Sequence, residues 1–82
     1  DIGCGCGAML GYLKGMYPNA HTYGVEGNSK LADFAKNMAN VICEDIENVE
    51  LPWGEKYFDY IIIGDISGKL KNLDTSQRNL GI

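Results

Sequence analysis

The sequence predicts an α/β fold with a parallel sheet and helices on both faces, of which these 82 residues form an incomplete part. Three observations predict this fold class. A glycine-rich segment at residues 3–7 leads directly into a helical pattern. Short apolar stretches of strand length then alternate with helical patterns. Finally, residues 58–63 are nearly continuously apolar and β-branched, which is typical of a parallel strand covered on both faces.

The first elements are set by glycine, proline and β-branched residues. Residues 3–7 alternate glycine with cysteine and predict a loop with unusual backbone angles. A helix is expected over residues 8–17, with Met9, Leu13 and Met16 on one apolar face and Leu10, Leu13 and Tyr17 beside it. The Pro-Asn pair at residues 18–19 ends this helix. A short strand is expected over residues 20–26.

A second helix is predicted over residues 30–37 or 30–38, with Ser29 as its N-cap. Its apolar residues recur at i, i+3, i+4 and i+7 and predict one buried face: Leu31, Phe34, Ala35 and Met38. Two further strands are expected, over residues 41–43 and 58–63, separated by an acidic loop. The right-handed crossover rule predicts that the second, first and fourth strands lie next to one another in that order.

The two ends of the chain differ from this regular pattern. No hydrophobic run stands ahead of residues 3–7, so the strand that should precede this loop is represented only by its last one or two residues. We therefore expect the chain to be an excerpt. Residues 66–82 contain three leucines without a sustained period and are interpreted as a helical or irregular continuation.

Composition excludes several classes of partner and site. The formal net charge is −4 and the basic residues are scattered, which argues against a nucleic-acid-binding surface. No run reaches the roughly 20 apolar residues of a membrane span, and a cytoplasmic location is the default expectation. Cys4, Cys6 and Cys43 are odd in number and lack C-x-x-C spacing. We therefore expect them to fill tight space and predict no metal site.

The glycine loop is the first candidate ligand site. Gly3, Gly5 and Gly7 would let the backbone approach a ligand where a Cβ would block it, and the helix start favours polar or anionic groups. At least one of these glycines should therefore adopt a backbone conformation that is costly for other residues. Gly3, Gly5 and Ala8 also satisfy the dinucleotide pattern G-x-G-x-x-G/A, so the glycines alone do not identify which nucleotide is bound.

Three acidic residues near strand ends indicate which chemical groups the ligand carries. Glu26 lies 19 positions after Gly7, where a carboxylate can accept both hydroxyls of a ribose. Asp1 precedes the glycines and suits a ligand with a free ammonium group. Asp45 can accept from an exocyclic adenine amine, and the backbone N–H of Ile46 can donate to a ring nitrogen. The alternative for Asp45 is a solvated acid in an acidic turn, and the same alternative holds for Glu26.

These motifs together resemble a known family. Residues 1–65 resemble the class I S-adenosylmethionine-dependent methyltransferases in the order and approximate spacing of four segments. Residues 1–8 look like the family's first glycine motif, and residues 23–27 look like the acid that clasps the ribose. Residues 43–47 are similar to the loop that brackets adenine. Residues 58–65 resemble the fourth strand, whose end faces the methionine and the methyl group.

The resemblance implies that residues 1–65 are a Rossmann-like domain that binds S-adenosylmethionine, the cofactor-binding half of an enzyme that methylates a small molecule or another acceptor. Asp65 is the candidate catalytic base, although residues 66–70 lack the family's acid-and-histidine segment. The residues implied to bind the cofactor are Asp1, Gly3, Cys4, Gly5, Gly7, Glu26, Gly27, Asp45, Ile46 and Gly64.

Two other functions compete with this one. A nicotinamide-dependent oxidoreductase fragment would use the same glycine pattern, but Asp1 and a third glycine at position 7 count against it. A catalytically inactive fragment that keeps the nucleotide-binding fold is the second alternative. The short chain and the altered residues 66–70 favour it.

Overall fold

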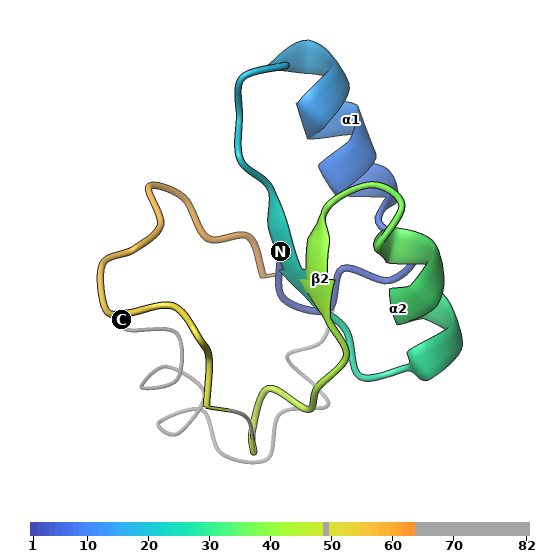
Figure 1. Ribbon diagram of the computed structural model, residues 1–82, viewed down its shortest axis with the longest axis vertical. Helices are drawn as coiled ribbons and strands as arrows, with labels where there is room; N and C mark the ends of the chain where they lie inside the picture. Colours follow the sequence, from blue (N-terminus) through green and yellow to red (C-terminus); the bar gives the residue numbers. More distant parts are fainter. Residues whose placement is uncertain (49, 64–82) are drawn as a thin grey trace.

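A computed structural model describes residues 1–48 and 50–63 of the chain, and its elements alternate between helix and strand as the sequence predicts. They follow one another in the order α1 (Ala8–Met16), β1 (Tyr23–Val25), α2 (Ser29–Ala35) and β2 (Asn40–Ile42) (Figure 1). The two strands pair in parallel, with Gly24 opposite Val41. The predicted α/β class with a parallel sheet is confirmed.

Ile2 extends the sheet on the other side of β1. It makes parallel bridges to Val25 and to Ile63, and the N–H of Ile2 donates to the carbonyl of Ile62 at 2.8 Å. The order across the sheet is therefore β2, β1, Ile2 and Ile63, with the N-terminus beside the end of the described chain in Figure 1. This confirms the predicted adjacency of the second, first and fourth strands. All strand pairings among the described residues are parallel.

The prediction of a covered parallel strand over residues 58–63 is wrong for most of its length. Among the described residues of this segment only Ile63 forms a bridge, and residues 60–62 are exposed, with Tyr60 at 90% and Ile62 at 36%. A parallel strand needs a neighbour along its length to satisfy its backbone groups. Within the described residues only Ile2 bridges to this segment, so the pairing is limited to one position and neither face is covered as expected.

Helix α1 begins directly after the glycine loop and contacts the sheet through fewer residues than predicted. Leu10 is buried and Leu13 is half-buried. Met9, Met16 and Tyr17, which were expected on apolar faces, are each at least half exposed. Only the middle of the helix therefore contributes to the core.

Helix α2 buries Ala35 of the predicted face but not the bulky residues of that face, and it buries Ala32 in addition. Ala32 and Ala35 are fully buried, whereas Phe34 is 67% exposed and Leu31 and Met38 also face solvent. The reason is the close approach of α2 to the glycine loop: a Cβ added at Gly7 would lie only 3.0 Å from the Cα of Ala35. At that distance only small residues fit between the backbones, so the bulky apolar residues lie outside.

Two clusters of buried residues lie in the core. The first joins both helices to the sheet and consists of Cys4, Leu10, Ala32, Ala35 and Val41. The second consists of Ile2, Val25 and Ile46, with Ile42, Leu51 and Trp53 packed against it. Both described helices thus contribute to the first cluster, and Figure 1 places them on the same side of the strands.

The second cluster is covered by the segment 51–58, in which the structure shows no helix. Four aromatic rings pack edge to face there, with centroids 5.0–5.8 Å apart: Tyr23, Trp53, Tyr57 and Phe58. Edge-to-face packing of this kind stabilises a small core beyond the area that it buries. In the part of the chain that the structure describes, neither helix is long and apolar enough to cross a membrane.

Candidate functional site

The glycine loop adopts the backbone conformation that the sequence predicts. Gly3, Gly5 and Gly7 all have positive φ angles, at 71°, 58° and 88°. Side chains with a Cβ are strained in this region, so the expectation of at least one costly glycine conformation is confirmed. A Cβ added at Gly5 would meet no atom within 4 Å. The backbone of the loop at Gly5 is therefore open to an approaching group.

Glu26 links the loop to the start of α2. The N–H of Gly5 donates to Glu26 Oε1 at 2.9 Å, and the N–H of Asn28 donates to Glu26 Oε2 at 2.8 Å. The backbone of Glu26 continues the parallel ladder beyond β1, because its N–H donates to the carbonyl of Ile42. The sheet thus fixes the main chain of Glu26, while two backbone donors fix its carboxylate.

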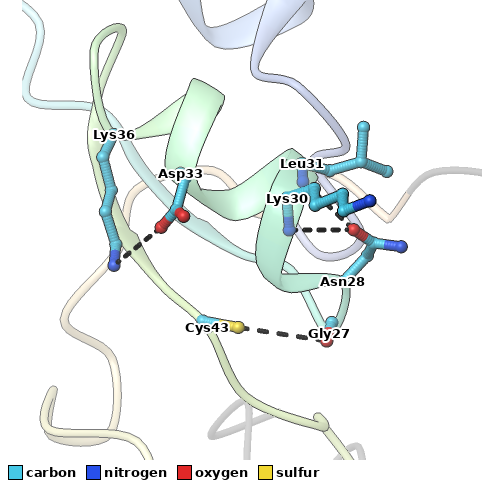
Figure 2. A network of polar contacts seen from close by, with 7 residues as sticks. All are labelled: Gly27, Asn28, Lys30, Leu31, Asp33, Lys36 and Cys43. Atoms are coloured by element: carbon cyan, nitrogen blue, oxygen red, sulfur yellow. Dashed lines mark hydrogen bonds and ion pairs between the residues drawn. The ribbon is translucent and has the colours of Figure 1, made fainter.

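Asn28 is a site residue that sequence reasoning missed. It is the N-cap of α2, and its side-chain Oδ1 accepts from the N–H groups of Lys30 at 3.0 Å and Leu31 at 3.1 Å (Figure 2). Ser29, the predicted N-cap, is instead the first residue of the helix. The signal was present in the sequence, because Asn ranks at least as high as Ser at this position and stands one residue earlier.

Asp45 forms the acidic turn that was its alternative interpretation. Its Oδ1 accepts from the N–H of Glu47 at 3.0 Å, and its Oδ2 accepts from the side-chain amide of Asn48 at 2.9 Å. The side chain of Ile46 is buried in the second cluster, so a ligand could contact Ile46 only through its backbone. The adenine contacts of Asp45 and Ile46 stay predictions.

The other predicted residues are placed as follows. Asp1 pairs with β1 through its backbone, since its nitrogen donates to the carbonyl of Tyr23 at 2.8 Å and its carbonyl accepts from Val25. Gly27 is exposed and accepts a weak bond from the thiol of Cys43 at 3.9 Å (Figure 2). Gly64 and Asp65 lie outside the described residues.

Cys4 is a core residue. It is 8% exposed in the first cluster, and a Cβ added at Gly24 would lie only 2.8 Å from its sulfur. Burial raises the pKa of the Cys4 thiol, and the negative charge of Glu26 raises this pKa further. A thiol of this kind stays protonated at neutral pH and is a poor nucleophile. Its side chain packs in the core, so any ligand contact of Cys4 would come from its backbone.

Cysteine substitutions test this packing. From sequence alone, Cys4→Ser and Cys6→Ser are both expected to have little effect, but only Cys6 is exposed. Cys4→Ser places a hydroxyl in an apolar cluster and should lower the free energy of unfolding by about 1–3 kcal/mol. Cys6→Ser serves as the matched control and should change it by less than about 0.5 kcal/mol. Urea denaturation measures both, and equal stabilities would contradict the burial of Cys4.

A cavity of about 850 Å³ lies apart from the glycine loop and Glu26. It is bounded by the start of β1 and by residues 57–62, and Asp1 and Ile2 lie at its wall. None of Gly5, Gly7 and Glu26 lines it. Of the predicted cofactor-binding residues that the structure describes, only Asp1 lines the cavity. Within the described residues, no group of three or more His, Cys, Asp or Glu side chains could hold a metal ion.

Comparison with known proteins assigns the chain to a family. The family model described as a methyltransferase domain matches residues 1–79. Among solved structures, the chain is similar to the plantazolicin methyltransferase BpumL, solved in complex with a pentazolic desmethylPZN analogue and SAH. The sequence identity is 35%, the TM-score is 0.60, and the match covers 70% of this chain and 23% of BpumL.

The chain thus spans about a quarter of the length of that structure. No match was found among curated proteins. The family match extends over nearly the whole chain, and the order of the strands and the glycine loop agree with the resemblance on which the sequence prediction rested. The chain belongs to the methyltransferase domain family.

Proposed function

We propose that this chain forms the S-adenosylmethionine-binding part of a methyltransferase, with the cofactor held where the strands end at the glycine loop and Glu26. The family match supports methyl transfer, and the matched enzyme was solved with SAH. The observation that carries the proposal is the hydrogen bond between Gly5 and Glu26, at 2.9 Å. It holds an open backbone loop and a carboxylate side by side, which suits a ligand that carries both a ribose and a polar chain.

The carboxylate of Glu26 has the capacity that a ribose requires. An ionised carboxylate offers about four acceptor positions. Gly5 and Asn28 each use one of them, one on each oxygen. One position therefore stays available on each oxygen, and two hydroxyls can be accepted at once. The open space beside Gly5 also fits the group, since a Cβ there would meet nothing within 4 Å.

The remaining predicted contacts complete the proposed site. The backbone of Gly3, Cys4, Gly5 and Gly7 would follow the methionine end of the cofactor, and the carboxylate of Asp1 would bind its ammonium group. Gly27, Asp45 and Ile46 would border the ribose and adenine, and Gly64 and Asp65 would lie near the methyl group. From composition we also infer a cytoplasmic location, with neither nucleic acid nor a membrane as partner.

The role of the protein in this reaction is positioning. The bound cofactor supplies an electrophilic methyl group on its sulfonium, and an enzyme of this kind aligns an acceptor with it. In this chain, Glu26 would fix the ribose and the glycine loop would fix the methionine chain. Asp65 is the residue that we propose as a proton acceptor.

Calorimetric titration of the 82-residue chain separates the three candidate functions. We expect SAH to bind at least tenfold more tightly than NAD, because only SAH offers an ammonium group to Asp1. A preference for NAD would favour the oxidoreductase alternative. Failure of the folded chain to bind either compound would contradict the proposal and favour the inactive fragment. Circular dichroism of the same sample shows that the chain is folded.

A further inference from the structure

Asn28, at the start of α2, is hydrogen-bonded to the carboxylate of Glu26, which we propose to bind the cofactor. Asn28 is hydrogen-bonded both to Glu26 and to the first turn of α2, and Figure 2 shows its side chain at the N–H groups of Lys30 and Leu31. Its backbone N–H donates to Glu26 Oε2, and its side-chain oxygen accepts two N–H groups of the helix. Asn28 therefore transmits the position of the helix to the carboxylate.

The opposite side of the carboxylate is fixed by the glycine loop. Glu26 Oε1 accepts from Gly5, and the loop itself lies close against α2, because a Cβ added at Gly7 would be only 3.0 Å from the Cα of Ala35. The carboxylate thus lies in a closed circuit that runs from the loop to Glu26, through Asn28 to α2, and back to the loop through Ala35 and Gly7. In this circuit, the link between residue 28 and α2 depends on the side chain of Asn28, which accepts from the N–H groups of Lys30 and Leu31.

We propose that Asn28 is a positioning residue that sets the orientation of the Glu26 carboxylate for the ribose of the cofactor. The proposal rests on the function proposed above. Loss of the Asn28 cap frees the first turn of α2, so the backbone N–H of residue 28 no longer has a fixed direction. Without that donor, the carboxylate keeps only its hydrogen bond to Gly5 and can rotate about its own side-chain bonds, away from the orientation that would accept two ribose hydroxyls.

The test compares three variants of the full chain. Asn28→Ala removes the cap, Asn28→Ser keeps an oxygen that can cap the helix, and Asp33→Gly weakens the middle of α2 without touching the cap. The amide proton of Gly5, which donates to a carboxylate, is the spectroscopic reporter in a ¹H–¹⁵N spectrum. Calorimetry with SAH reports the consequence for binding.

We expect Asn28→Ala to shift the Gly5 amide resonance and to weaken SAH binding about three- to tenfold, the equivalent of about 0.7–1.4 kcal/mol. Asn28→Ser should restore both values to within twofold of the original affinity. Asp33→Gly should lower the stability of the chain and leave the Gly5 resonance and the affinity of the folded protein unchanged.

Three results would overturn the proposal: an unshifted Gly5 amide in Asn28→Ala, unchanged SAH affinity in that variant, or the same losses in Asp33→Gly. The last result would reduce Asn28 to a helix-stabilising residue. The Gly5 reporter needs no cofactor, so it is read independently of binding. If the resonance shifts as expected while the original chain does not bind SAH, the proposed function fails and the positioning of the carboxylate by Asn28 is supported.

Discussion

Gly7→Ala is expected to lower the free energy of unfolding by about 2–4 kcal/mol, a large part of the stability of so small a domain. Two penalties add at this position. The φ angle of 88° is strained for any residue with a Cβ, and the added carbon would lie 3.0 Å from the Cα and 3.1 Å from the Cβ of Ala35. Those atoms belong to a helix and cannot rotate away, so α2 must shift.

Two other glycines separate the penalties. Gly5→Ala keeps the strain of a positive φ but meets no neighbouring atom, so it should cost only about 1–2 kcal/mol. Gly15→Ala, in the exposed part of α1, meets no atom either and should stabilise the chain by about 0.5–1 kcal/mol. Urea denaturation of the three variants gives the ranking. Equal losses in the free energy of unfolding for Gly5→Ala and Gly7→Ala would mean that α2 moves away from the added Cβ without destabilising the chain.

Glu26→Ala should weaken SAH binding about ten- to a hundredfold, because it removes a charged acceptor for two hydroxyls. The sequence alone leads to the expectation that this change leaves the fold intact. The structure revises it, since the carboxylate also accepts from Gly5 and Asn28 in the absence of a ligand. A simultaneous loss of about 1–3 kcal/mol in the free energy of unfolding is therefore expected.

The two effects of Glu26→Ala are distinguished by measuring affinity below the unfolding transition, where circular dichroism shows the variant to be folded. Glu55→Ala is the matched control, because it removes the same charge from an exposed position away from the loop. It should change neither the affinity nor the stability by more than measurement error. Unchanged SAH affinity in folded Glu26→Ala would exclude the ribose role.

The order of elements and the parallel pairing could be predicted because they depend on short sequence patterns. The buried face of α2 could not. Hydrophobic periodicity selects Ala35 correctly together with Leu31 and Phe34, but α2 lies so close to Gly7 at Ala35 that the two bulky side chains are exposed. That distance results from packing between segments and leaves no mark in the local pattern.

The candidate site shows the same division. The positions of the loop glycines and of Glu26 at the end of β1 follow from sequence spacing. The bond from Gly5 to Glu26 joins residues in different elements, so no local motif announces it. The expectation that Cys4 fills tight space is confirmed, because its side chain packs against Leu10 and Gly24 in the core, whereas its contact with the ligand stays a prediction.

The single-residue bridge at Ile2 divides the molecule into units of unequal cooperativity. The two helices and β2 share one cluster of buried residues, and β1 pairs with β2 along its whole length, so these elements should open and close together. Among the described residues, those from 59 to 63 are bridged to the sheet at one position, where Ile63 pairs with Ile2. An opening at Ile2 could therefore release residues 59–63 while the loop, Glu26 and α2 stay folded. Residues 59–63 are thus expected to unfold locally while the hydrogen bonds from Gly5 and Asn28 to Glu26 stay formed.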